Sequence, residues 1–220
     1  MTVDEAITKA FLHAQRKATP PAAGTSKYEA LVIIADSVQK MWAAEPDVEW
    51  DSLYSLVQLA SAVSATDTFA LSNTIDYISK REGDYILLTD GTNTVKYTLV
   101  KPNQLYTKRD QQVVARVGSN LKFPKAFAAD SSLIGYNIKV PSILKVNDLD
   151  SGSDVIQVDD PMWQVYMMAA EFVRNDVVKS NQYDNILALA DQHMSRMKQN
   201  NSGSIDEIAT PWQPAGESWV

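Results

Sequence analysis

Three segments in the first 65 residues place apolar side chains three and four positions apart, which is the spacing of an amphipathic helix. Each segment begins at residues suited to capping a helix: Thr2 with Glu5, Ser26 with Glu29, and Asp51. Prolines separate the segments, because proline cannot continue the hydrogen-bond pattern of a helix interior. The pattern therefore predicts a small bundle of three helices over residues 1–65.

The pattern changes after residue 65, where β-branched and aromatic residues alternate with polar ones in short runs. The clearest runs flank Asp90-Gly91, a pair that supplies the positive φ angles of a type I′ hairpin turn. Further runs, separated by glycines and prolines, are Gln112–Val117, Ser132–Val140, Ile143–Val146 and Asp154–Val158. We expect an antiparallel β module of roughly five to seven short strands over residues 66–158.

Helical spacing returns at residue 159. Asp160 is suited to cap a helix whose first position is Pro161, where a missing N–H costs nothing. Ser180 or Asn181 begins a second helix, whose apolar stripe ends at Met197. The predicted fold class is α+β: a helical bundle formed by the N- and C-terminal helices, residues 1–65 and 159–199, with an inserted antiparallel β module, residues 66–158, and an extended C-terminal tail, residues 200–220.

The C-terminal tail combines a polar spacer with two tryptophans that stand among prolines and a glycine. Prolines and glycine oppose both helix and strand, whereas solvated tails normally lack aromatic residues. Because aromatic anchors dominate interface energetics, we favour docking of the tail on another surface; the alternative is that it folds onto its own domain. The candidate docking residues are Ile205, Ile208, Pro211, Trp212, Pro214, Trp219 and Val220.

The composition limits the classes of protein. The chain has 220 residues, a net charge of −7 and no cysteine, which excludes disulfide scaffolds, thiolate zinc sites and cysteine nucleophiles. Its first residues lack the pattern of a signal peptide, and no apolar run approaches the length that spans a membrane. We therefore expect a soluble protein made in a cytoplasm, with no membrane partner.

Basic residues gather in the middle of the chain. From Asp76 to Lys125 there are nine lysines and arginines against five acidic residues, and acidic stretches flank this segment. The arrangement is typical of subunits that meet copies of themselves or a charged partner, although lysines at solvated strand edges give the same pattern. The candidate subunit-facing or DNA-facing residues are Lys101, Lys108, Arg109 and Arg116. The negative total charge argues against tight autonomous binding of DNA.

Candidate chemistry is sparse. The only two histidines, His13 and His193, lie on predicted helices without a partner at metal-ligand spacing, and no phosphate-loop, dinucleotide or nucleophile-elbow motif is present. The stretch Asp148–Asp154 alternates carboxylates as a calcium loop does, but Gly152 and Ser153 occupy positions where an EF-hand needs a ligand and a glycine. A solvated acidic turn is the favoured interpretation. The sequence thus predicts no catalytic site, cofactor or metal.

The segment from Val158 to Asp176 resembles the C-terminal helical region of head-to-tail adaptor (connector, neck) proteins of tailed bacteriophages. The resemblance rests on a D-P-x-W start at Asp160, on the stretch A-A-E-x-x-R-N-D that begins at Ala169, and on a closing helix like residues 183–198. The order of short helices, β insertion, two returning helices and extended tail is also similar. The insertion here is longer than in minimal members of that family.

The resemblance implies a structural virion protein of the phage neck, made in the cytoplasm of a bacterial host. Copies would form a ring, typically of twelve, whose C-terminal tails dock on the portal protein. The ring would receive the tail or a stopper protein, and viral DNA would pass through its centre without specific binding. The alternatives are a tail-completion or stopper protein, a non-specific DNA-binding module, and an enzyme that uses unrecognised carboxylates.

Overall fold

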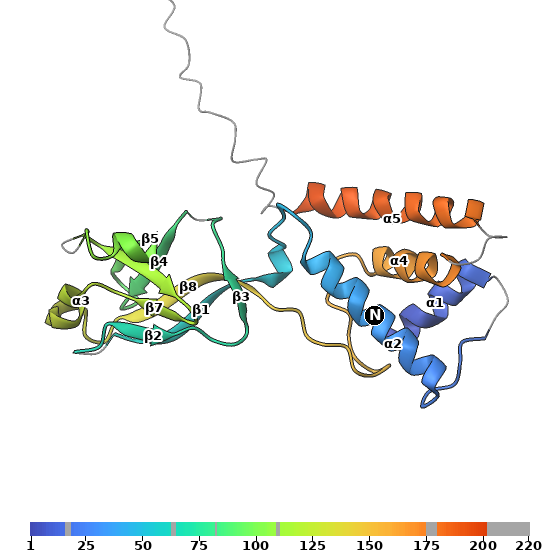
Figure 1. The fold of residues 1–220 in the computed structure, drawn as a ribbon, viewed down its shortest axis with the longest axis horizontal. Coiled ribbons are helices and arrows are strands. Elements are labelled where there is room, and N and C mark those ends of the chain that lie inside the picture. The colour runs from blue at the N-terminus through green and yellow to red at the C-terminus, as the bar shows by residue number, and fades with distance from the viewer. Residues whose placement is uncertain (16–18, 63–64, 82, 109–110, 175–179, 202–220) are drawn as a thin grey trace, which may run out of the picture. The chain divides into compact units, whose positions relative to one another are not determined.

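The computed structural model describes residues 1–15, 19–62, 65–81, 83–108, 111–174 and 180–201 (Figure 1). The chain forms two compact units. The helical unit consists of Met1–Ser52 together with the described residues from Val146 onward. The β unit consists of Leu53–Lys145. Both ends of the described chain therefore belong to the same unit.

Four helices build the helical unit: α1 (Val3–Gln15), α2 (Ser26–Ala43), α4 (Pro161–Val173) and α5 (Ser180–Asn200). α4 contacts each of the other three helices (Figure 1). It buries residues around most of its circumference, whereas α5 buries one stripe of Ile186, Ala190 and Met197. α4 is therefore the central helix of this unit.

The predicted starts of α1 and α4 are confirmed, and that of α2 is shifted by one residue. The main-chain N–H of Thr2 donates to Glu5 Oε2 at 3.0 Å, and the N–H of Glu5 donates to Thr2 Oγ1 at 3.3 Å, which completes the capping box. Asp160 caps α4 by accepting from the N–H of Met162 at 3.0 Å. The cap of α2 is Thr25, one residue before the predicted Ser26.

Two buried glutamines fasten the returning chain to α2. Gln39 donates from Nε2 to the carbonyl of Asn147 at 2.9 Å, and its Oε1 accepts from the N–H of Gln157 at 2.7 Å. Gln164 of α4 donates to the carbonyl of Ala35 at 3.0 Å. Buried backbone groups need such partners. Gln39 supplies them at Asn147 and Gln157 of the returning segment, and Gln164 binds a carbonyl of α2.

The predicted third helix at residues 51–65 is wrong. Asp51–Leu53 forms one 3₁₀ turn, and β1 (Tyr54–Ser61) follows directly. The helical spacing of apolar residues here did not reflect burial, since Leu56 is 42% exposed. Pairing of β1 with a long central strand decides the conformation in place of the local pattern. The β unit accordingly begins at Leu53 instead of residue 66, and residues 146–158 belong to the helical unit.

The predicted helical bundle with an inserted antiparallel β module is therefore also wrong. The described residues form a mixed α+β fold with five helices and a large, nearly closed, barrel-like sheet. Its strands are β1 (Tyr54–Ser61), β2 (Thr68–Ala70), β3 (Ile75–Ile78), β4 (Tyr85–Thr89), β5 (Thr94–Val100), β6 (Val113–Val117), β7 (Asn120–Lys122) and β8 (Asn137–Leu144).

Seven strands follow one path in the order β1-β8-β4-β5-β6-β7-β2, and β3 pairs with β8 outside it. The edge strands β1 and β2 contact each other, which nearly closes the sheet. All pairs are antiparallel except β5 with β6, which is parallel. A parallel pair needs a crossover, and residues 101–112 supply it.

β8 joins two predicted strands across Pro141. It pairs with β1 along one side, and on the other side with β4 through Lys139 and with β3 from Ser142 onward. Pro141 thus lies between the two partner strands, where its missing N–H removes no ladder hydrogen bond on that side. A central strand can therefore contain a proline that we expected to end it.

Aromatic rings fill one end of the β unit. Phe127, from the short helix α3 (Lys125–Ala129), stacks on Phe123 with ring centroids 4.2 Å apart. Tyr97 and Phe69 meet Phe123 edge to face, at 5.2 and 5.7 Å. Such geometries stabilise beyond the burial of area alone, so α3 is held on the sheet by its ring contacts.

The predicted hairpin is confirmed, although its turn is longer than a type I′ turn. β4 and β5 pair up to Thr89 opposite Thr94, which leaves residues 90–93 as the loop. Gly91 alone of these has a positive φ, at 96°. The carboxylate of Asp90 accepts from the N–H groups of Asn93 and Thr92 at 2.6 and 2.8 Å. These hydrogen bonds, that of the Asn93 backbone first, lower the pKa of Asp90 to about 2.

We expect the Asp90 carboxyl to titrate near pH 2, against a usual value of 3.8. Because the folded pKa is depressed, the contribution of Asp90 to stability is complete above about pH 4 and is lost as the pH falls towards about 2. Carboxyl ¹³C shifts measured by NMR check the midpoint, and Asp90→Asn should remove this part of the acid dependence of unfolding. A midpoint near 4 would contradict the hydrogen-bonded turn.

Candidate functional site

Asp160 joins the start of α4 to α5. One carboxylate oxygen caps α4, and the other lies 2.5 Å from His193 Nδ1. The ring of Tyr166 packs between the two histidines of the chain, 4.9 Å from His13 and 5.3 Å from His193. Asp160, with which the adaptor motif begins, therefore caps α4 and binds α5. The pairing of Asp160 with His193 was missed, because no local spacing links residues so far apart.

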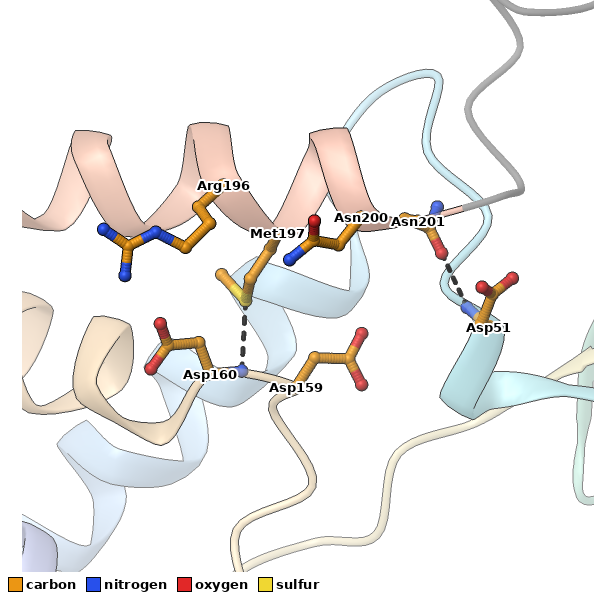
Figure 2. Close-up of a pocket in the computed structure, with 7 residues that line it drawn as sticks. All are labelled: Asp51, Asp159, Asp160, Arg196, Met197, Asn200 and Asn201. Atoms are coloured by element: carbon orange, nitrogen blue, oxygen red, sulfur yellow. Dashed lines mark hydrogen bonds between the residues drawn. The ribbon is translucent and has the colours of Figure 1, made fainter.

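A polar hollow of about 370 Å³ opens beside this pair (Figure 2). Its lining residues are Asp51, Asp159, Asp160, Arg196, Met197, Asn200 and Asn201. Met197 contributes its sulfur, which accepts from the N–H of Asp160 at 3.2 Å. Three carboxylates against one guanidinium give the hollow a negative balance, which suits a cationic side chain better than an anion.

Asn201, the last described residue, is bound by its side chain to the segment that leads into the 3₁₀ turn. Its side chain is buried, and Oδ1 accepts from the N–H of Asp51 at 2.8 Å (Figure 2). Nδ2 donates to the carbonyl of Glu49 at 2.9 Å. The predicted tail began at Asn200, which is the last residue of α5, and Asn201 after it is attached to residues 49 and 51 of the helical unit. The predicted docking residues Ile205, Ile208, Pro211, Trp212, Pro214, Trp219 and Val220 lie outside the described residues.

The predicted basic residues come together only in part. In the parallel pair β5–β6, Val100 lies opposite Ala115. Arg116 follows Ala115 within β6, whereas Lys101 lies just beyond the end of β5. Arg116 donates from Nε to the carbonyl of Gly118 at 3.2 Å. Lys108 lies farther along the crossover, and Arg109 is outside the described residues.

A second hollow, of about 450 Å³, lies on the β unit and is here called the Tyr106 hollow. It is lined by Asp67, Leu105, Tyr106, Lys122, Phe123, Pro124, Lys125 and Ala126. Leu105 and Phe123 are buried, whereas Tyr106 is 64% exposed. Sequence reasoning missed this site because its walls come from the crossover and from the segment after β7.

The two units differ in net charge. Residues 53–145 hold eleven lysines and arginines against seven aspartates and glutamates, whereas the rest of the chain holds nine against twenty. The β unit is therefore positive and the remainder of the chain strongly negative. Copies that pair unlike units would gain from this complementarity.

The carboxylates of the Asp148–Asp154 stretch bind groups of the chain itself. Asp154 accepts from the N–H groups of Asp150 and Ser151, both at 2.8 Å. Asp148 lies 2.6 Å from Lys40 Nζ, and this hydrogen bond lowers the pKa of Asp148. Among the described residues, no group of three or more histidines and carboxylates is arranged to hold a metal ion.

Two comparisons with known proteins assign no family to the chain. Neither a scan against protein-family models nor a search of curated proteins gives a match. No helix in the described part of the chain combines the length and the apolar character needed to cross a bilayer. The expected absence of enzymatic activity and of a cofactor stays a prediction.

Gly152 leaves room for a buried contact between α1 and α2. A Cβ at this position would overlap the Tyr28 hydroxyl and the Asp4 carboxylate, which hydrogen-bond to each other. Burial, with the bond to Asp4, raises the pKa of Tyr28 to about 12. We expect Gly152→Ala to lower the free energy of unfolding by about 1–3 kcal/mol in urea denaturation. Ser153→Ala, at the exposed neighbour, is the control; equal stability of both variants would contradict this packing.

Asn201→Ala should lower the free energy of unfolding by about 1–3 kcal/mol, because the Glu49 carbonyl and the Asp51 N–H lose their side-chain partner. Urea denaturation of the full chain measures the change. Asn200→Ala is the matched control, since Asn200 is exposed and precedes the anchored residue. If the two alanine variants unfold at the same denaturant concentration, Asn201 does not anchor the chain.

Proposed function

We propose that this protein is a structural component of the neck of a tailed bacteriophage, an adaptor whose copies form a ring and dock on the portal protein. The observation that carries the proposal is the resemblance of residues 158–176 to adaptor proteins. In the structure the first part of that segment forms α4, whose Trp163, Ala169 and Ala170 are buried at the centre of the helical unit. Resembling residues thus contribute to the core of the helical unit, which supports the proposal.

The position of the tail supports docking as its role. Asn201 is held by two side-chain hydrogen bonds, so the residues beyond it start from a fixed point. These residues carry two tryptophans and three acidic residues, and no basic residue. An anchored base followed by aromatic residues is suited to reach a partner while the helical unit stays intact.

The charge separation supports assembly from copies. Rings close through head-to-tail interfaces, in which different surfaces of neighbouring copies meet. A positive β unit and a negative remainder give each copy two unlike surfaces. In the assembled neck, the ring passes viral DNA and receives the tail or a stopper protein.

Deleting residues 202–220, with Asn201 retained, should abolish attachment to purified portal rings and leave the fold unchanged. Electron micrographs of negatively stained portal particles measure decoration, and circular dichroism measures the fold. Leu189→Ala, an exposed apolar position on α5, is a control that should decorate portals as the unchanged chain does. Decoration by the truncated chain would refute portal docking by the tail, and binding to tail components alone would favour a stopper protein.

A further inference from the structure

The Tyr106 hollow has an apolar floor and a basic rim. Phe123 forms part of the floor and is 1% exposed, and its ring is fixed by stacking on Phe127 at 4.2 Å. Lys122 and Lys125 line the hollow, against Asp67 as its acidic residue. A volume of about 450 Å³ falls within the usual range of binding pockets, roughly 300–1,000 Å³. The hollow therefore suits an apolar or aromatic group that belongs to an anionic chain.

The backbone on both sides of the hollow is held in place. The N–H of Phe123 donates to the carbonyl of Asp67 at 2.8 Å, next to the pairing of β2 with β7. On the crossover, the N–H groups of Thr107 and Lys108 both bond the carbonyl of Gln104, which forms a turn around Tyr106. Leu105 packs with Val113 of β6. The exposed Tyr106 thus stands on a fixed turn, as a preorganised contact requires.

The C-terminal sequence has the complementary chemistry. Pro211-Trp212-Gln213-Pro214 places two prolines three positions apart around an aromatic residue. Proline-rich segments of this spacing bind aromatic-lined grooves, because their preformed extended backbone loses little entropy on binding. Residues 202–220 as a whole also contain the acidic residues Asp206, Glu207 and Glu217, and no basic residue follows Lys198.

We propose that the Tyr106 hollow binds the C-terminal segment, residues 202–220, of a second copy of this chain. Trp212 enters the apolar floor, the flanking prolines pack on Tyr106, and the acidic residues face Lys122 and Lys125. A second copy is the partner because the β unit is positive and the rest of the chain negative, which favours contact between unlike units of two copies.

This second use of the tail goes beyond portal docking. Each contact of this kind joins different surfaces of two copies, so it extends in one direction around a ring. The portal protein and the hollow would compete for one segment, which keeps copies loosely associated until a portal is present. The inference needs no portal protein for its test, so the two proposals can fail separately.

A fluorescently labelled peptide with the sequence of residues 202–220 provides the direct test. It is titrated with the full-length chain carrying Trp212→Ala and Trp219→Ala, whose own tail then does not compete. We expect saturable binding by anisotropy. Adding Tyr106→Ala should weaken binding about tenfold, and Lys125→Glu should weaken it and flatten its salt dependence.

Matched controls are available on the same unit. Ile134→Ala changes an exposed apolar residue outside the hollow, and Lys145→Glu changes an exposed lysine at the end of the sheet. Both should bind the peptide as the parent does. A peptide with Trp212→Ala should bind weakly to the parent, because it lacks the ring that enters the apolar floor. Lys125→Glu keeps the test valid if Tyr106→Ala impairs folding.

Sedimentation of the chain with its natural tail identifies the occupant. Association that grows with concentration and is lost on Trp212→Ala supports a second copy. A chain that stays monomeric while the peptide binds only the tail variant would show that each hollow holds its own tail, which overturns the proposal. Equal peptide binding by the Tyr106, Lys125 and control variants, or no saturation up to roughly millimolar concentration, would also overturn it.

Discussion

The side-chain amide of Gln39 joins the two parts of the chain that build the helical unit. Residues 53–145 separate these parts in sequence, so the unit can form only after the chain returns. Gln39 binds the returning segment through one donor, to Asn147, and one acceptor, from Gln157. Gln164 of α4 adds a hydrogen bond to Ala35 of α2. Both glutamines are completely buried. The amide of Gln39 has a partner for both its donor and its acceptor, and a buried polar group left unpaired loses its hydration without compensation. Among the described residues, Gln164 Oε1 has no hydrogen-bond partner, so Gln39 provides the more complete connection.

The ends of elements were predictable where local chemistry decides them. Thr2 with Glu5 and Asp160 with Pro161 each satisfy backbone groups within their own turn, so the sequence contains the whole interaction. The hairpin around Asp90 was predictable for the same reason. Its exact loop was not, because the Asp90 carboxylate holds a four-residue loop through the N–H groups of Thr92 and Asn93, in place of a two-residue turn.

The third helix and the strand boundary at Pro141 show what local patterns omit. Residues 54–61 form a strand because β8 pairs with them, and Pro141 is tolerated because β3 and β4 divide one side of β8 between them. The same limit applies to the sites: Asp160 with His193, and Tyr106 with Phe123, meet only through the tertiary fold. Residue types suggested candidates such as Lys101 and Arg116, but their placement depends on the parallel register of two strands.

The distribution of indole rings makes the two units spectroscopically distinct. Trp42 and Trp50 stack with centroids 5.0 Å apart inside the helical unit, and Trp163 is buried there as well. Residues 53–145 contain no tryptophan, whereas Tyr97 is buried among their aromatic rings. Indole emission therefore follows the helical unit and the C-terminal residues alone, while tyrosine absorbance also reports on the sheet. The melting of the helical unit can thus be followed without an indole signal from residues 53–145.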